Sequence, residues 1–193
     1  MSHSKTKTVK KIYITNDSKE KVIENYRTIV IGAGIIGAAC AAALASKGEN
    51  VILIDGSCTQ SIRSSYGDTR GIQFGYNGIK GKLVLRAGKL WNKLEKEKST
   101  HKKLLYDSGN LYFGNSNDIE QIMSMYNETN RSVEKLEGNN IELRFPQAKA
   151  HPISKNITAL YDSTALAVDA QAAINSFINV AKEKGAIYIQ EDN

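Results

Sequence analysis

The sequence of 193 residues contains few of the residue types that bind metals or form disulfides. It has two cysteines and three histidines, and Cys40 and Cys58 cannot build a disulfide framework. His3, His101 and His151 have no cysteine or histidine partner at metal-ligand spacing, so we expect no metal. Low cysteine content is typical of a reducing compartment, and the N-terminus lacks the apolar core of a signal peptide, so we expect a cytoplasmic protein.

No hydrophobic run is both long and uninterrupted enough to predict a membrane span. The seventeen residues from Ile29 to Ala45 carry no charge, and this length is at the lower limit for crossing a bilayer. Three glycines interrupt the run near its start, Lys47 follows it closely, and no aromatic belt flanks it. We therefore expect no membrane partner.

The formal net charge of +6 is concentrated at one end of the chain. Residues 1–30 hold seven basic and three acidic side chains, whereas the remaining charges are interspersed in sign, as on solvated helix faces. We expect no nucleic-acid partner. Residues 1–27, rich in serine, lysine, threonine and asparagine, are predicted to form a basic polar tail; the alternative for "IYIT" (Ile12–Thr15) is a short strand.

Residues 28–56 have the pattern of a strand, a helix and a second strand. The runs "TIVI" (Thr28–Ile31) and "NVILID" (Asn50–Asp55) are apolar and rich in β-branched residues, which is typical of strands buried on both faces. Between them, "AACAAALASK" favours a helix that ends at Gly48 and in which Cys40 is a small buried residue. A β–α–β unit of this length implies parallel strands with a right-handed crossover.

The rest of the chain predicts a mixture of helices and strands. A helix is expected at 82–98, with an apolar stripe of Leu83, Leu85, Leu90, Trp91 and Leu94, and a second one from Asp118 to Glu137. Further segments are expected as short strands on both sides of a turn at 108–110, strands at 141–146 and 156–162, a helix at 169–184 and a last strand at 186–190. This order indicates an α/β nucleotide-binding domain interrupted by a second domain.

Three glycines between the first strand and its helix fit the spacing G-x-G-x-x-G. Gly32 permits a tight turn, Gly34 lets the backbone approach a pyrophosphate, and Gly37 lets the helix pack against the strand. The helix N-terminus, at Ile35 and Ile36, offers free N–H groups and the positive end of its dipole to phosphates. The motif predicts a dinucleotide site; the alternative is a structural β–α–β unit that binds nothing.

Asp55 ends the second strand, eighteen residues after Gly37. A carboxylate at this position can accept hydrogen bonds from ribose hydroxyls, and it repels a 2′-phosphate, so NADP is disfavoured. The glycines and Asp55 do not distinguish FAD from NAD.

The stretch "SSYGDTRG" (Ser64–Gly71) follows the second strand and carries a single arginine. Arg70 can lie beside an electron-rich ring system and favour its anionic form, and Asp68 can hold Arg70 in place. The alternative is a solvent-exposed loop with a local ion pair.

Residues 28–193 resemble the FAD-dependent amine oxidases of the D-amino-acid oxidase superfamily, most of all the monomeric sarcosine oxidase and N-methyltryptophan oxidase group. The stretches that carry the resemblance are "VIGAGIIG", "VILID", "GDTRGIQFGY", "LVLRAGKLWNKLEKE", "SGNLYFGNS" and "AVDAQAAINSFINVAKEKGA". The resemblance implies FAD as cofactor, a contact between Arg70 and the isoalloxazine ring, and positions near the cofactor for Ser64, Ser65 and Thr69.

Two positions depart from the pattern of that group. Tyr66 stands where the group usually has a histidine, and Gln73 stands where it has an arginine that helps to bind the substrate carboxylate. Glutamine can donate a hydrogen bond but has no charge to pair with a carboxylate. Gln73 is therefore a candidate substrate-binding residue that implies either another source of charge or a different substrate.

The resemblance implies a Rossmann-like FAD-binding domain with a parallel sheet (28–103 and 169–193), interrupted by part of an α+β substrate domain (104–168). Because family members run substantially further, the chain is expected to be an N-terminal portion of such a protein. The implied reaction is oxidation of the C–N bond of a secondary or N-methylated amine or amino acid, with oxygen or an electron carrier as acceptor. The alternatives are another FAD-dependent dehydrogenase of the superfamily and a truncated, non-catalytic nucleotide-binding fragment.

Overall fold

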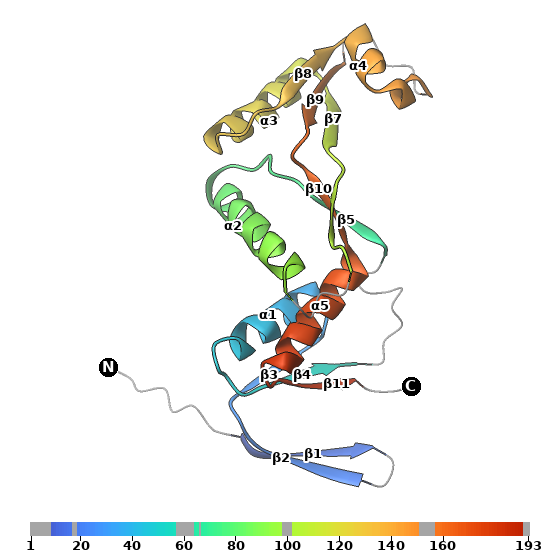
Figure 1. The fold of residues 1–193 in the computed structure, drawn as a ribbon. Helices are drawn as coiled ribbons and strands as arrows, with labels where there is room; N and C mark the ends of the chain where they lie inside the picture. Colours follow the sequence, from blue (N-terminus) through green and yellow to red (C-terminus); the bar gives the residue numbers. More distant parts are fainter. Residues whose placement is uncertain are drawn as a thin grey trace, which may run out of the picture. The chain divides into compact units, whose positions relative to one another are not determined.

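The computed structural model places the helices and strands in two compact units (Figure 1), which are described separately below. The residues that the structure describes are 9–16, 19–56, 64–65, 67–97, 102–150 and 157–190. The first unit comprises Met1–Asp68, Glu97–Lys102 and Ala170–Asn193, and the second comprises Thr69–Lys96 and Lys103–Asp169. The residues singled out above that lie outside the described ranges are His3, Cys58, Tyr66, His101 and His151.

A parallel three-stranded sheet forms the centre of the first unit. Its strands are β3 (Thr28–Ile31), β4 (Val51–Asp55) and β11 (Ile187–Gln190), in the order β11-β4-β3. Helices α1 (Ile35–Ala45) and α5 (Ala170–Glu183) pack against each other and against this sheet (Figure 1). The predicted β–α–β unit is thereby confirmed.

Small side chains let these two helices approach closely. Alanines at 38, 41, 42 and 45 recur with the helical period and are all buried. They pack with Ile174 and Ala181 of α5 and with Val51 and Leu53 of β4 in one core. Cys40, predicted to be buried, is exposed, because it lies on the opposite side of α1 from the alanine face.

Residues 9–26 form a β-hairpin, so the prediction of a polar tail over 1–27 is wrong for this part. Strands β1 (Val9–Asn16) and β2 (Lys19–Tyr26) are antiparallel, with Asn16 opposite Lys19. Lysines and asparagines dominate the composition and suggest a tail. The β-branched and aromatic residues between them have the strand propensity that the average composition hides.

Two antiparallel three-stranded sheets build the second unit. The first contains β5 (Thr69–Ile72), β10 (Leu166–Asp169) and β6 (Leu105–Asp107), in that order. The second contains β7 (Asn110–Gly114), β9 (Thr158–Asp162) and β8 (Glu134–Glu137). The helices are α2 (Gly78–Glu95), α3 (Ser116–Glu128), α4 (Asn139–Arg144) and a 3₁₀ turn at Pro146–Ala150. This unit includes residues 69–96, which the sequence grouped with the nucleotide-binding domain; the functional domain boundaries stay a prediction.

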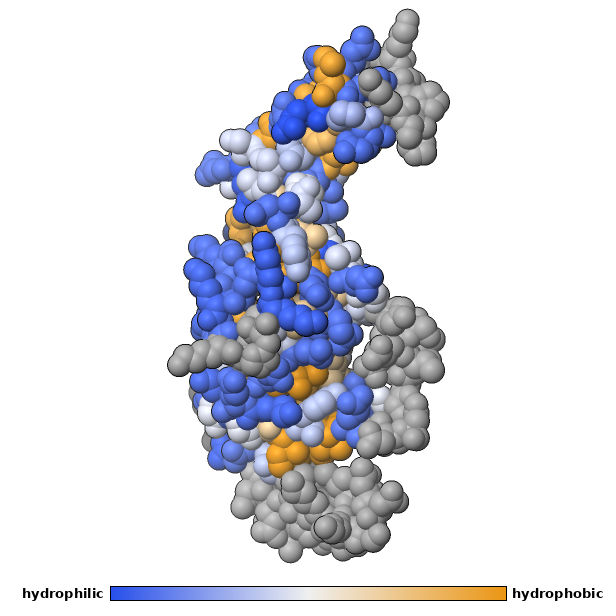
Figure 2. Space-filling view, turned by 45° about the vertical axis from the view of Figure 1, so that its right-hand side comes forward, coloured by the Kyte–Doolittle hydropathy of each residue, from blue (hydrophilic) through white to orange (hydrophobic). Residues whose placement is uncertain are grey.

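Helix α2 packs through two glycines and through part of the predicted stripe, since Leu94 is buried and Leu85 and Trp91 are half-buried. A Cβ atom at Gly81 would lie 2.6 Å from the Tyr76 carbonyl oxygen, and one at Gly88 would lie 3.3 Å from the Phe74 ring. Leu83 and Leu90, which the periodicity placed in the apolar stripe, are exposed instead. Figure 2 shows the surface from one side: hydrophilic residues cover most of the described part, and hydrophobic residues form separate orange patches.

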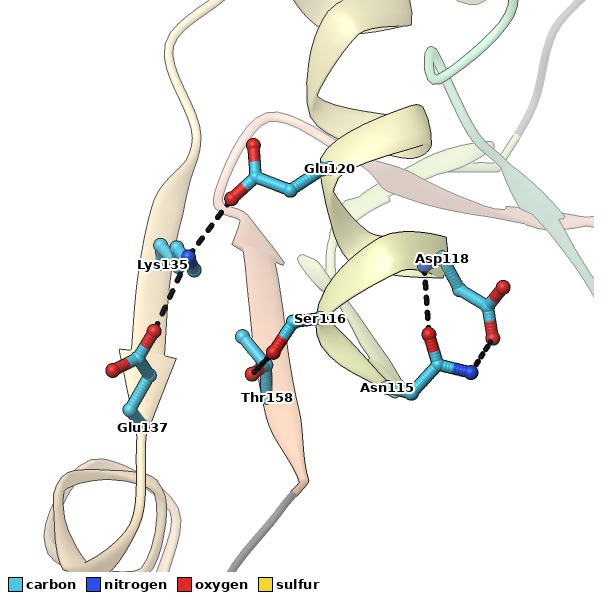
Figure 3. A network of polar contacts seen from close by, with 7 residues as sticks. All are labelled: Asn115, Ser116, Asp118, Glu120, Lys135, Glu137 and Thr158. Carbon is cyan, nitrogen blue, oxygen red and sulfur yellow. Dashed lines mark hydrogen bonds and ion pairs between the residues drawn. The ribbon is translucent and has the colours of Figure 1, made fainter.

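Asn115 caps α3, which therefore begins two residues before the predicted start at Asp118. The Asn115 side-chain oxygen accepts a hydrogen bond from the Asp118 N–H at 3.0 Å, and its amide donates to the Asp118 carboxylate at 2.7 Å (Figure 3). The helix ends at Glu128 rather than at Glu137, since residues 134–137 form β8. In Figure 3, Lys135 of β8 pairs with Glu120 of α3 at 2.9 Å and with Glu137 at 3.2 Å, and both partners raise the pKa of Lys135.

The strand predicted at 141–146 is also wrong, because α4 occupies Asn139–Arg144. Ile141 of this helix is fully buried against Leu136 and Ala159 of the second sheet. Burial of one side chain per turn is sufficient to anchor a short helix, whereas an alternating strand pattern would bury every second residue.

A buried carboxylate connects β9, α3 and β7. The Tyr126 hydroxyl donates to Asp162 Oδ2 at 2.7 Å, and the N–H and hydroxyl of Thr164 donate to Asp162 Oδ1 at 2.8 and 2.6 Å. The Tyr112 and Tyr126 hydroxyls lie 3.3 Å apart. Burial raises the pKa of Tyr126, and its hydrogen bonds with Tyr112 and Asp162 raise it further. Asp162 is therefore held by three donors inside the second unit.

The raised pKa of Tyr126 predicts a loss of stability at alkaline pH. Above about pH 10 the tyrosine of the unfolded chain loses its proton while native Tyr126 keeps it. The unfolded state then binds fewer protons, so the free energy of unfolding falls with pH, by up to about 1.4 kcal/mol per pH unit. Urea denaturation between about pH 9 and pH 11 measures this slope. The free energy of unfolding should fall less steeply with pH in Tyr126→Phe. An equally steep fall would contradict the raised pKa of Tyr126.

Candidate nucleotide-binding site

The loop between β3 and α1 has the conformation that its glycines predict. Gly32 has φ +92°, and its N–H donates to the Ile54 carbonyl at 2.7 Å. A Cβ atom at Gly37 would lie 1.8 Å from the Gly32 carbonyl oxygen, so the turn of the loop and the start of α1 are in direct contact. Gly34, the N-cap of α1, has no atom within 4 Å of the position that its Cβ would take. The fold needs a glycine at 37, whereas at 34 it leaves open space in front of the backbone.

Asp55 joins the end of β4 to this loop. Its side chain is 6% exposed, and Oδ1 accepts a hydrogen bond from the Ala33 N–H at 2.9 Å. Ala33 is the residue between the first two glycines of the motif. Asp55 therefore holds the glycine loop in shape, in addition to the ribose contact that its position predicts.

A cleft of about 340 Å³ lies beside Asp55 and the loop, at the carboxyl ends of the parallel strands. Ligands of open α/β sheets bind at this edge. The residues that line the cleft are Ala33, Gly34, Asp55, Ser65, Gln171, Ile174, Asn175, Ile178, Tyr188 and Gln190. The glycine loop and the Asp55 carboxylate line one part of the cleft. Helix α5 lines another part, with the amide side chains of Gln171 and Asn175.

Four polar cleft residues were missed by the sequence analysis: Gln171, Asn175, Tyr188 and Gln190. Gln190 could have been found, because it ends the strand that lies next to β4, as Asp55 ends β4 itself. Gln171 and Asn175 are one helical turn apart, and their side chains are 3.3 Å from each other. Only the packing of α5 on α1 brings them to the cleft, and no local pattern indicates that contact.

The structure brings together part of the predicted site in the first unit. The three glycines, Asp55 and Ser65 surround the cleft or shape its loop. Ile35 packs into the core with α5, while Ile36 is exposed at the start of α1. Ser64 directly precedes Ser65.

The other predicted residues lie along one segment of the second unit. Thr69 and Arg70 are in β5, and Gln73 follows this strand half-buried. Arg70 is exposed, and its Nη1 donates to the Thr69 carbonyl at 2.7 Å. The Asp68 carbonyl accepts from the Ala170 N–H at 3.0 Å. The predicted ion pair between Asp68 and Arg70 stays a prediction.

The described ranges contain neither a metal-ligand cluster nor a helix that could cross a membrane. No three histidine, cysteine, aspartate or glutamate side chains there gather closely enough to hold a metal ion. In the same residues, every helix is too short or too polar to cross a bilayer.

Comparisons with known proteins identify the family and the fold of the chain. A family model described as FAD dependent oxidoreductase matches residues 27–192. Monomeric sarcosine oxidase from Bacillus sp. (strain B-0618) is 30% identical over 170 residues, which cover 84% of this chain and 42% of that protein. N-methyl-L-tryptophan oxidase from Escherichia coli (strain K12) is 30% identical over 165 residues, with coverage of 83% and 43%. The chain thus spans less than half the length of these relatives.

Solved structures have the same fold at lower identity. NikD, described as an unusual amino acid oxidase essential for nikkomycin biosynthesis, superposes with a TM-score of 0.70 at 21% identity, over 86% of this chain and 43% of that one. L-proline dehydrogenase from P. horikoshii gives a TM-score of 0.68 at 23% identity, over 86% and 44%. These matches confirm the α/β fold with its parallel sheet. Since the family model covers most of the chain, this protein belongs to the family of FAD-dependent oxidoreductases.

Proposed function

We propose that this chain supplies the ADP-binding part of the FAD site in an oxidoreductase that acts on the C–N bond of a secondary or N-methylated amine or amino acid. The observation that carries the proposal is the cleft at the carboxyl ends of β3, β4 and β11, with Gly34 and Asp55 in its wall. The names of the relatives, sarcosine oxidase and N-methyl-L-tryptophan oxidase, support the substrate class.

The residues of the cleft fit a dinucleotide. The open space at Gly34 gives a pyrophosphate access to the backbone N–H groups that begin α1. Asp55 keeps the loop in this shape through Ala33 and presents a carboxylate at the cleft, where a ribose hydroxyl would donate to it. Amide side chains of α5 and Gln190 of β11 offer donors and acceptors to the remaining polar atoms of the nucleotide.

Other residues are assigned by the family resemblance. FAD, when bound, supplies the electron acceptor for oxidation of the C–N bond. Ser64, Thr69 and Arg70 would lie along the flavin, where the guanidinium of Arg70 favours an anionic ring. Gln73 would bind the substrate through a hydrogen bond instead of an ion pair. The final electron acceptor would be oxygen or an electron carrier.

The domain roles and the location in the cell belong to the same proposal. Residues 28–103 and 169–193 would form the FAD-binding domain, and 104–168 would form part of the substrate domain. The low cysteine content favours the cytoplasm.

Gly34→Ala tests the proposed pyrophosphate contact. The added methyl group meets no protein atom within 4 Å, so the free energy of unfolding should stay nearly unchanged. The same methyl group would block close approach of a phosphate, so the affinity for FAD should fall at least about tenfold, or about 1.4 kcal/mol. Equilibrium dialysis against FAD and urea denaturation measure the two quantities on the same preparations. If the variant binds FAD as tightly as the parent chain, the pyrophosphate does not lie at Gly34.

A further inference from the structure

The cleft beside Asp55 extends beyond the parts proposed for pyrophosphate and ribose. Gly34 and Asp55 lie in its wall, and most of the other lining residues come from α5 and from β11. With the pyrophosphate at Gly34 and a ribose hydroxyl at Asp55, the base of the nucleotide would lie against α5 and β11. The side chains of these two elements therefore decide which base the cleft accepts.

One face of α5 turns toward the cleft. Its members Gln171, Ile174, Asn175 and Ile178 follow the helical spacing i, i+3, i+4, i+7. Ile174 and Ile178 are buried in the core between α1, α5 and the sheet, against which Tyr188 of β11 also packs. We call these two isoleucines and Tyr188 the apolar floor. The cleft thus combines an apolar floor, suited to the flat face of a base, with the two exposed amides of α5.

The two amides of α5 are joined to each other. The Gln171 side-chain N–H donates to Asn175 Oδ1 at 3.3 Å. Among the residues that the structure describes, neither of these side chains has another hydrogen-bond partner. Asn175 Oδ1 keeps a second lone pair, and the Asn175 NH2 group keeps its N–H bonds. Asn175 can therefore accept one hydrogen bond and donate another along one edge of a ligand, while Gln171 holds its amide in this orientation.

An asparagine amide matches one edge of adenine and not the same edge of guanine. The edge of adenine that carries N6 and N7 presents one donor and one acceptor, and asparagine binds it with two hydrogen bonds. The same edge of guanine presents two acceptors, O6 and N7. One of these acceptors would face the Asn175 carbonyl oxygen in either orientation of the amide, and a contact between two acceptors away from water is unfavourable.

We propose that Asn175 binds the N6 and N7 edge of adenine in this cleft, with Gln171 as a positioning residue, so that the site selects adenine over guanine nucleotides. This role rests on the proposed function, because it requires a nucleotide with its phosphates at Gly34. The N6 amine would donate to Asn175 Oδ1, the Asn175 NH2 group would donate to N7, and the base would pack on the apolar floor. Gln190 also lines the cleft, but within the described ranges no hydrogen bond of its side chain fixes its amide.

Calorimetric titration of the 193-residue chain with three nucleotides tests the selectivity. ADP should bind at least about fivefold more tightly than GDP, which presents O6 in place of the N6 amine. The analogue 7-deaza-ADP, in which a C–H group replaces N7, should bind about threefold more weakly than ADP, since it cannot accept from Asn175.

Alanine variants separate the roles of the amides. Asn175→Ala should weaken ADP binding at least about fivefold and bring the affinities for ADP and GDP within about twofold of each other. Gln171→Ala should lower the preference for ADP only in part, because Asn175 keeps its own two contacts with the base. Gln190→Ala should weaken ADP and GDP alike, so the preference remains. Gln121→Ala removes an exposed amide from α3 of the second unit and should change neither affinity.

The ratio of the two affinities distinguishes base recognition from a structural effect, because damage to α5 would weaken both nucleotides equally. Alanine favours a helix at least as strongly as asparagine or glutamine, and circular dichroism should show the helix content of the parent chain in every variant.

Equal affinities for ADP and GDP in the parent chain would overturn this role of Asn175, as would an unchanged preference in Asn175→Ala or a preference lost in Gln190→Ala. In those cases the proposed function still stands if Gly34→Ala weakens the binding of both nucleotides. If neither nucleotide binds to the folded chain, the proposed function fails together with this role of Asn175.

Discussion

Gly37→Ala is expected to prevent the first unit from folding. The new Cβ would lie 1.8 Å from the Gly32 carbonyl oxygen and 3.0 Å from its carbonyl carbon. Both are backbone atoms of a turn whose N–H is bonded to Ile54, so no side chain can rotate away to relieve the overlap. We expect a loss of on the order of 4 kcal/mol or more from the free energy of unfolding, comparable with the total stability of many domains.

Gly34→Ala is the matched control for this experiment. It adds the same methyl group three residues earlier in the same motif, where the structure has open space. Urea denaturation followed by circular dichroism should therefore separate the two variants by several kcal/mol. Equal stabilities would show that β3 and α1 do not meet through Gly32 and Gly37 as described.

Asp162→Ala is expected to destabilise the second unit by about 3 to 5 kcal/mol. The substitution removes the acceptor of three donors, namely the Tyr126 hydroxyl and the N–H and hydroxyl of Thr164. Asp162 and Tyr126 are fully buried, so water cannot replace the lost bonds without opening the structure. The measurement is urea denaturation near pH 7, monitored by tyrosine absorbance in the near ultraviolet.

Tyr126→Phe provides the comparison for that variant. It removes one donor and leaves Asp162 with both bonds from Thr164, so the expected loss is smaller, about 1 to 2 kcal/mol. If Asp162→Ala lowers the free energy of unfolding by less than about 1 kcal/mol, the buried hydrogen bonds to this carboxylate do not stabilise the second unit as described.

The first unit was predictable because its determinants are local. The strand from Thr28, the three glycines and the strand ending at Asp55 follow one another within thirty residues. Each constrains the next through backbone geometry: Gly37 must avoid Gly32, and the crossover must return to a parallel strand. The contribution of α5 to the cleft could not be predicted, since it depends on a contact between helices more than 120 residues apart.

The errors in the second unit arise where tertiary contacts override local preference. The segment "EKLE" (Glu134–Glu137) has the composition of a helix end, yet it forms β8, with Lys135 between Glu120 and Glu137 and Leu136 buried. Pairing with β9 decides its structure, and no pattern within residues 118–137 reveals that partner.

The glycines of α2 show the same limitation. Leucines are normally the packing residues of an amphipathic helix, so the periodicity of Leu83 and Leu90 predicted a buried stripe. Of the predicted stripe only Leu94 is buried, and the helix packs also through Gly81 and Gly88, because the backbone at Tyr76 and the ring of Phe74 come too close for larger side chains. Sequence alone cannot distinguish a leucine that faces the core from one that is exposed on the same helix.

Nuclear magnetic resonance titration of the 193-residue chain with ADP tests directly whether the cleft beside Asp55 binds a nucleotide. If the cleft binds the ADP part of FAD, backbone amides at the glycine loop, at Asp55 and at Gln190 should show saturable shifts, and these shifts should be lost in Gly34→Ala. Amides of the second sheet of the second unit, such as those of β8, serve as internal controls and should not move. A folded chain that shows no saturable shifts around the cleft, or shifts unaffected by Gly34→Ala, would contradict the assignment of this cleft to the ADP part of FAD.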